Sequence, residues 1–119
     1  MGYTTEFQGT LELDRKLDDE THTELDQLNQ RRHGGDIDHD GFPSFYCQWV
    51  PTEDGKAIMW DGGEKFYGYI EWLQHIIDKY LKPKDYVLNG KLLYSGEEIG
   101  DTGSITVENN VITRREVTL

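Results

Sequence analysis

The fold is decided by residues 64–81, which read EKFYGYIEWLQHIIDKYL. Apolar side chains recur here at intervals of three and four, which places them along one face of an α-helix. Pro83 ends the pattern, and Lys79 and Lys82 suit the negative end of a helix dipole. The apolar positions are Phe66, Tyr69, Ile70, Leu73, Ile76, Ile77 and Tyr80. We therefore predict one long amphipathic helix, which needs an apolar surface to cover.

Strand patterns precede this helix. Residues 3–13 alternate apolar and polar side chains, as a half-buried strand does. Residues 45–50 are aromatic and β-prone, and a turn over residues 51–56 joins them to a second β-prone run at residues 57–60. We expect one strand from the first region and a hairpin from the second.

A short helix is expected between these regions, and more strands are expected after the long helix. The run Leu17-Asp18-Asp19-Glu20 offers a helix N-cap and early acidic residues, and Leu25 and Leu28 follow at helical spacing. Residues 86–94 resemble a hairpin around an Asn89-Gly90 turn, and residues 105–113 resemble another hairpin through Asn109-Asn110.

This order of elements predicts the α+β class. The expected architecture is an antiparallel sheet of about five to seven strands, packed against one long amphipathic helix, with a second short helix near the N-terminus. A chain of 119 residues is expected to form a single domain over residues 1–119.

The charge of the chain excludes one broad class of function. The sequence has 23 acidic and 12 basic residues, giving a net charge of −11, of which −8 lies in residues 1–60 and −3 in the remainder. Such a chain is not expected to bind nucleic acid directly, because binding to phosphates needs a basic surface. We find no apolar run that fits a membrane span or a signal peptide, so a cytoplasmic location is expected.

One loop has the spacing of a cation site. Residues 36–41 read DIDHDG, and carboxylates at positions one, three and five before a glycine are typical of calcium loops of the EF-hand type. The resemblance ends there, because Cys47 occupies position twelve in place of a glutamate. A divalent cation such as Ca²⁺ is one alternative, and a polar loop without metal is the other; no other cofactor is expected. The candidate ligands are His33, Asp36, Asp38, His39 and Asp40.

The sequence contains no assembled catalytic motif, so the chain is not expected to be an enzyme. Cys47 is the single cysteine, and its alternation with Phe45 and Trp49 predicts a buried, inert thiol. Carboxylates also lie close together at Glu97, Glu98 and Asp101, but so acidic a chain produces such groups by chance, and nothing selects one pair for acid–base chemistry.

Aromatic residues provide a second candidate site. The chain has 3 Trp, 7 Tyr and 4 Phe, most of which are expected to form the core. Those at the margins of the predicted faces are suited to anchor a protein partner with a basic surface. The candidate partner-binding residues are Tyr46, Tyr67 and Trp72, together with the acidic Asp18, Asp19 and Glu20.

Several motifs resemble a known family. The segments YCQWVP at residues 46–51 and WDGGEKFY at residues 60–67, with YTTEFQG at residues 3–9, resemble a family of small, uncharacterised proteins of bacteria and their phages. The resemblance implies an accessory protein of the cytosol, of the kind that phages carry. It implies no catalytic residues.

Three hypotheses follow. The first is a small acidic interaction protein that binds and blocks a basic, nucleic-acid-binding surface of a host or defence protein. The alternatives are a metal-binding protein or metal-dependent enzyme that uses the loop at residues 36–40, and a small-molecule binder with an aromatic pocket between helix and sheet. The oligomeric state is left open.

Overall fold

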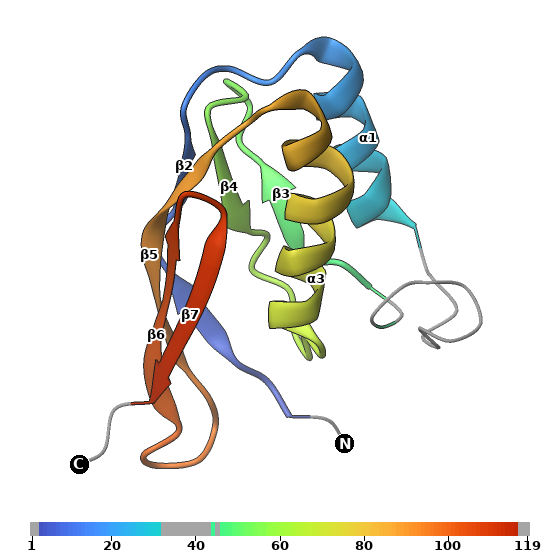
Figure 1. Ribbon diagram of the computed structural model, residues 1–119. Coiled ribbons are helices and arrows are strands. Elements are labelled where there is room, and N and C mark those ends of the chain that lie inside the picture. The colour runs from blue at the N-terminus through green and yellow to red at the C-terminus, as the bar shows by residue number, and fades with distance from the viewer. Residues whose placement is uncertain (1–2, 32–43, 45, 117–119) are drawn as a thin grey trace.

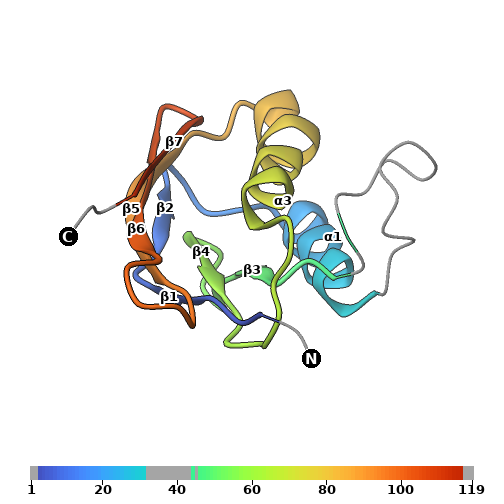
Figure 2. The same cartoon turned by 90° about the horizontal axis from the view of Figure 1, so that it is seen from below.

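The computed structural model describes residues 3–31, 44 and 46–116. They form an antiparallel sheet of seven strands together with helices, which confirms the predicted α+β class. Figure 1 and Figure 2 show that both α-helices lie on the same side of the sheet. Within this part of the chain, no helix is both long and apolar enough to cross a membrane.

Strand β5, Leu88–Ser95, is the centre of the sheet because it pairs with three other strands. Strands β1, Glu6–Gln8, and β2, Leu11–Leu13, pair with successive parts of the same side of β5. The other side pairs with β6, Thr102–Glu108, which in turn pairs with the edge strand β7, Val111–Glu116. The single strand predicted over residues 3–13 is therefore two strands, and the break contains Gly9, whose φ is 106°.

Two of the predicted hairpins are present. Strand β3, Trp49–Pro51, is shorter than predicted and pairs with β4, Ala57–Trp60, at the opposite edge of the sheet from β7. Strands β6 and β7 are joined by Asn109 and Asn110, with φ values of 50° and 69°. Positive φ at both residues is typical of the two-residue turn that suits the twist of a hairpin.

The hairpin predicted around Asn89-Gly90 is wrong. Both residues lie within the continuous strand β5. Gly90 has a φ of 149°, and a Cβ there would stand only 2.9 Å from the carbonyl oxygen of Thr10. Glycine is needed at this position because Thr10 and Leu11 lie against it and because its φ is positive, and not because the chain turns.

The helix predicted over residues 64–81 is shorter and less regular than expected. Helix α3 covers Tyr69–Ile76. A π-helical turn at Ile77–Leu81 and a 3₁₀ turn at Lys82–Lys84 then complete the helical segment.

The predicted start of the helix at Glu64 is wrong, because the core residue Phe66 precedes α3 without being helical. Lys65 and Gly68 have left-handed φ values of 58° and 67°, which a right-handed helix does not contain. Phe66 lies between them in a connection that is not helical, and its side chain is buried in the core. Its apolar side chain therefore continues the helical spacing although the backbone is not helical.

Helix α1, Asp19–Gln30, has twelve residues and is longer than the eight-residue α3. The predicted contrast between one long and one short helix is therefore wrong. The N-cap was found correctly within the predicted run, because the Asp18 carboxylate accepts a hydrogen bond of 2.7 Å from the Thr21 N–H.

The core lies between the sheet and α3, and aromatic rings fill one end of it. Phe7 from β1 packs edge-on against Trp49, Phe66 and Tyr69, with ring centroids 5.1–6.1 Å apart. These rings occupy the space in which an aromatic ligand pocket between helix and sheet was predicted. The aromatic side chains here stabilise the fold by packing against one another.

Candidate functional site

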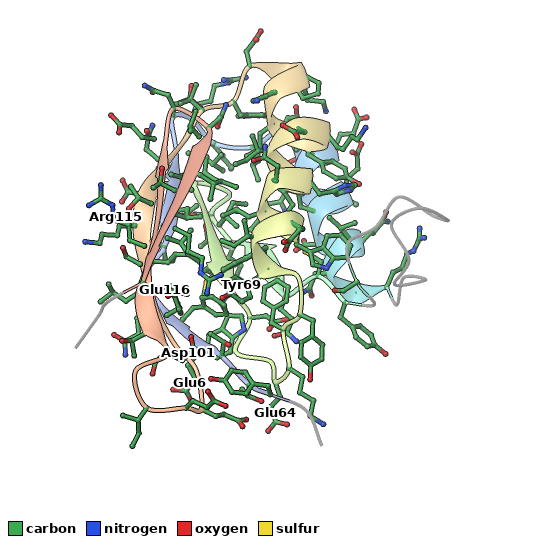
Figure 3. The ribbon with its side chains drawn as sticks, turned by 60° about the horizontal axis from the view of Figure 1, so that its bottom comes forward. Glu6, Glu64, Tyr69, Asp101, Arg115 and Glu116 are labelled. Carbon is green, nitrogen blue, oxygen red and sulfur yellow. The ribbon has the colours of Figure 1, made fainter. Side chains whose placement is uncertain are left out.

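Three hollows adjoin one another at the end of the molecule where β1 begins and β5 ends. The connections formed by residues 61–68 and 96–101 meet there. Figure 3 shows Glu6, Glu64 and Asp101 at this end. Each hollow shares lining residues with the next, so together they form one surface.

The middle hollow, which we call the acidic hollow, has a volume of about 400 Å³. Three exposed glutamates line it, and they come from three parts of the fold: Glu6 from β1, Glu64 from the connection before α3, and Glu97 from the connection after β5. The other lining residues are Thr4, Ser95 and Gly96. The lining therefore carries three negative charges and no lysine or arginine.

The first described residues of the chain hold the acidic hollow together. The Thr4 N–H donates to Glu97 Oε1 at 2.8 Å. The Tyr3 hydroxyl donates to Asp101 and accepts from the Glu98 N–H at 3.0 Å. The hydrogen bond to Asp101 raises the pKa of Tyr3. Residues 97–101 are thus fixed to the segment that leads into β1.

The second hollow, which we call the tyrosine hollow, has a volume of about 240 Å³ and shares Glu64 with the acidic hollow. Its walls include Tyr46 and Tyr67, which are 51 % and 50 % exposed, as well as Ser44 and Lys65. The Tyr67 hydroxyl accepts a 3.0 Å hydrogen bond from the Tyr3 N–H. This bond holds one of the two rings in place.

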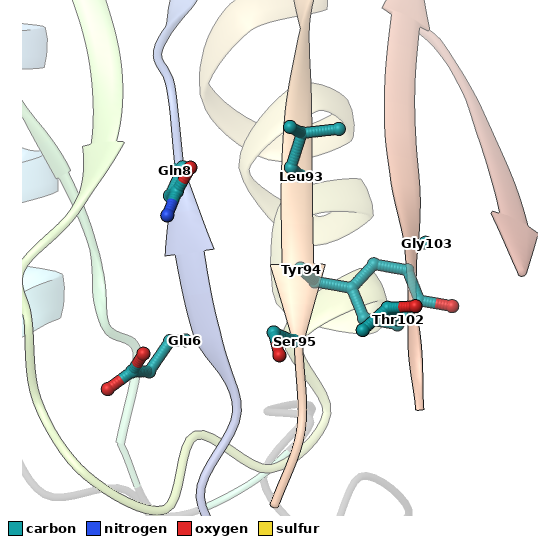
Figure 4. A pocket seen from close by; sticks show the side chains of 7 residues that line it. All are labelled: Glu6, Gln8, Leu93, Tyr94, Ser95, Thr102 and Gly103. Atoms are coloured by element: carbon teal, nitrogen blue, oxygen red, sulfur yellow. The ribbon is translucent and has the colours of Figure 1, made fainter. Parts of the chain in front are cut away.

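The third hollow lies on the outer face of the sheet and has a volume of about 300 Å³. It runs between Glu6 and Gln8 on β1, Leu93 and Ser95 on β5, and Thr102 on β6, as Figure 4 shows. Glu6 and Ser95 also line the acidic hollow. Leu93 is 51 % exposed and gives this end of the surface an apolar side chain.

The structure separates the three aromatic residues that were predicted to bind a partner. Tyr46 and Tyr67 are exposed and share the tyrosine hollow. Trp72 is fully buried, and its Nε1–H donates to Ser44 Oγ at 2.7 Å. Its predicted place at the margin of the helix is therefore wrong, because Trp72 lies with Leu73 and Ile76 on the face of α3 that packs into the core.

The acidic residues predicted at the start of α1 lie at the opposite end of the molecule (Figure 1). Asp18 has a structural role there, because it caps α1 and lies 3.6 Å from Lys84 Nζ. The hydrogen bond from the Thr21 N–H lowers the pKa of Asp18. Asp19 and Glu20 follow in the first turn and are exposed. The structure does not bring these residues to the tyrosines.

The predicted metal ligands His33, Asp36, Asp38, His39 and Asp40 lie outside the described residues. Among the residues that are described, no three His, Cys, Asp or Glu side chains are grouped so that they could hold a metal ion.

Cys47 is buried, as predicted, with 1 % of its surface exposed. Burial raises the pKa of its thiol to about 12. We expect the thiol of the folded protein to react with iodoacetamide at pH 8 at least about 100-fold more slowly than in denaturant, because only the thiolate of an opened molecule reacts. Mass spectrometry over time measures the two rates, and equal rates would contradict the burial of Cys47.

The same pKa predicts a loss of stability in alkali. An exposed thiol loses its proton near pH 8.5, whereas the folded protein keeps it up to about pH 12. Between these values the unfolded state binds fewer protons, so the free energy of unfolding falls as the pH rises. Urea unfolding from pH 8 to pH 11 is expected to show a steeper fall for the wild type than for Cys47→Ala.

The glutamates of the acidic hollow were not identified from the sequence. Glu6 appeared only as an outward-facing residue of a strand, and Glu64 only as the start of a helix. Glu97 belonged to a group of carboxylates that nothing distinguished from the others. Only the pairing of β1 with the end of β5, which aligns Glu6 with Ser95, brings these glutamates together. A single sequence contains no local pattern for that pairing.

Comparison with protein-family models, with curated proteins and with solved structures found no match to this chain. The resemblance to bacterial and phage proteins therefore stays a prediction. The function has to be argued from the geometry and charge of the site itself.

Proposed function

We propose that this chain is an acidic interaction protein that binds a basic surface of a partner protein and blocks it. The observation that carries the proposal is the junction of the acidic hollow with two half-exposed tyrosines through the shared residue Glu64. Complementary charge accelerates encounter and selects the partner. Tyrosine is among the residues that contribute most to binding energy at protein interfaces.

We propose further that the blocked surface is one that binds nucleic acid in a host or defence protein. Such surfaces present lysine and arginine to phosphate groups. Here carboxylates stand on and beside the paired strands β1 and β5, and the whole chain carries a net charge of −11. Carboxylates held on a sheet can occupy the positions that the phosphates of a nucleic acid take on the partner. This protein would therefore inhibit the partner by occupying its basic surface. The resemblance to phage proteins favours the same role.

The test is capture of partners by a wild-type and a variant protein. The variant Glu6→Gln/Glu64→Gln/Glu97→Gln removes three charges from the acidic hollow and keeps the size of the side chains. We expect it to bind the captured basic protein roughly tenfold more weakly, because each lost charge pair contributes up to about 1 kcal/mol. Surface plasmon resonance with the purified partner measures the affinity over a series of salt concentrations, and competition with DNA or RNA measures the blocking.

A matched control removes the same charge from the opposite end of the molecule. The variant Asp19→Asn/Glu20→Gln/Glu53→Gln changes three exposed acids there, including two that the sequence suggested for binding. We expect this variant to bind nearly as the wild type does. Equal losses in the two variants, or an affinity that does not change with ionic strength, would show that the acidic hollow is not the binding site.

A further inference from the structure

The tyrosine hollow combines the features that receive a planar cation. Two half-exposed rings, Tyr46 and Tyr67, line one space with the Glu64 carboxylate. The face of a tyrosine ring attracts a cation, and a guanidinium also stacks flat on the ring while its N–H groups bind a carboxylate. A lysine ammonium has no planar group to stack.

The chain itself contains arginines seated on tyrosine rings. The guanidinium of Arg15 lies 4.0 Å from the centre of the Tyr86 ring, and its N–H groups donate to the carbonyl oxygens of Asp85 and Lys84. Arg114 lies 5.1 Å from the centre of the Tyr94 ring. The Arg15 pair combines a ring face with oxygen acceptors beside it. The tyrosine hollow likewise combines two half-exposed tyrosines with a carboxylate.

The adjoining hollows favour an extended chain over a compact surface. From Leu93 the surface passes Glu6, reaches Glu64 and ends at the tyrosines, so a ligand that follows it has to run along its length. The N–H groups of Tyr3 and Thr4 already donate to Tyr67 and Glu97. These bonds hold Tyr67 and Glu97 in position on the surface. In an extended segment, every second side chain points to the same side.

We propose that the partner is bound through an extended segment that contains arginine, with one guanidinium on the rings of Tyr46 and Tyr67 beside Glu64. Further basic side chains of the segment lie against Glu6 and Glu97, and an apolar one lies against Leu93. This inference rests on the proposed function, because it describes how the same surface recognises its basic partner.

The probe is a fluorescent peptide of alternating glycine and arginine, compared with its glycine–lysine counterpart. Both peptides have the same charge, but only the arginine peptide carries a planar cationic group. Fluorescence anisotropy is expected to show about 3-fold tighter binding of the arginine peptide, because both cations are attracted to the rings and only the guanidinium also stacks flat on them. The double variant Tyr46→Leu/Tyr67→Leu is expected to remove this preference, because it weakens binding of the arginine peptide more than binding of the lysine peptide. Tyr46→Phe keeps the ring and is expected to keep the preference.

Lys65 supplies a variant that is expected to bind better. Its side chain lines the tyrosine hollow and repels a second cation there. Lys65→Gln removes the charge and retains most of the side chain, so we expect about 2-fold tighter binding of the arginine peptide. Misfolding of the variant does not produce such a gain.

The outcomes separate this inference from the proposed function. Three results would each overturn the proposed binding of arginine by Tyr46 and Tyr67. They are equal affinities for the two peptides, an arginine preference that survives in Tyr46→Leu/Tyr67→Leu, and no binding of the arginine peptide at millimolar concentration. Capture of a basic partner that depends on Glu6, Glu64 and Glu97 would still stand in each case. Failure of the proposed function appears instead as capture that is indifferent to those glutamates.

Discussion

Replacing Trp72 by alanine is expected to lower the free energy of unfolding by about 3–5 kcal/mol, the range found when a large buried aromatic side chain is removed. Trp72 has no exposed surface and is among the largest fully buried side chains. Its loss leaves a cavity at the start of α3. It also removes the N–H donor to Ser44, which in turn donates to the Tyr67 carbonyl oxygen at 2.9 Å. The expected change is a large fraction of the stability of a typical domain, which is about 5–15 kcal/mol.

Urea unfolding followed by circular dichroism measures this change. Trp72→Phe refills part of the cavity and is expected to lie between the wild type and Trp72→Ala. Tyr46→Ala is the control, since half of that ring is already in solvent, and it is expected to cost less than about 1 kcal/mol. If the alanine variants of Trp72 and Tyr46 lost equal stability, Trp72 would not be the buried residue described here.

Gly103→Ala is the second change with a large expected effect, at about 2–3 kcal/mol of destabilisation from overpacking. Gly103 lies opposite Tyr94 in the pairing of β5 with β6. A Cβ at Gly103 would overlap the carbonyl oxygen of Arg115 and would stand 2.5 Å from the Tyr94 hydroxyl and 2.7 Å from Tyr94 Cε2. Because one of these neighbours is backbone, rotation of a side chain does not relieve the overlap.

The control for Gly103→Ala is the next residue of the same strand. Ser104 faces outward on β6, so Ser104→Ala is expected to change the free energy of unfolding by less than about 0.5 kcal/mol. Thermal unfolding of both variants measures the difference. A Gly103→Ala protein as stable as Ser104→Ala would mean that β6 and β7 lie farther apart than the structure places them.

The sequence predicted the class of the fold better than the bounds of its elements. Periodicity located the helical segment because Leu73, Ile76 and Ile77 do face the core. It placed the start too early because a buried side chain contributes to the pattern whether it stands on a helix or on a loop, as Phe66 does. Only the left-handed φ of Gly68 marks the start, and a glycine alone does not reveal its φ.

The Asn89-Gly90 pair shows a different limit. The same two residues serve in a hairpin turn and in the middle of a strand where neighbouring backbones come close. Which use applies depends on β2, whose Leu11 pairs with Gly90. That partner lies near the other end of the sequence. Local sequence therefore predicted a turn, and the long-range pairing made it a strand.

The candidate site was predicted in part. Tyr46 and Tyr67 were chosen as marginal aromatic residues, and both are exposed. The accompanying charge was expected at the start of α1, because acidic residues are dense in the first half of the chain. Glu64 and Glu97 come from the second half, where the net charge is only −3. Charge density along the chain thus did not predict charge density in space.

The central position of β5 also determines when the protein can fold. Glu6 pairs with Ser95, and Leu13 pairs with Leu88, so β1 and β2 have to wait for a partner strand that is synthesised long after them. Contacts between such distant parts of a chain slow folding, because a long loop has to close before they form. The acidic hollow needs both β1 and the connection after β5. On the ribosome the acidic hollow therefore stays unformed after β1 has been made, until the connection that carries Glu97 has also emerged.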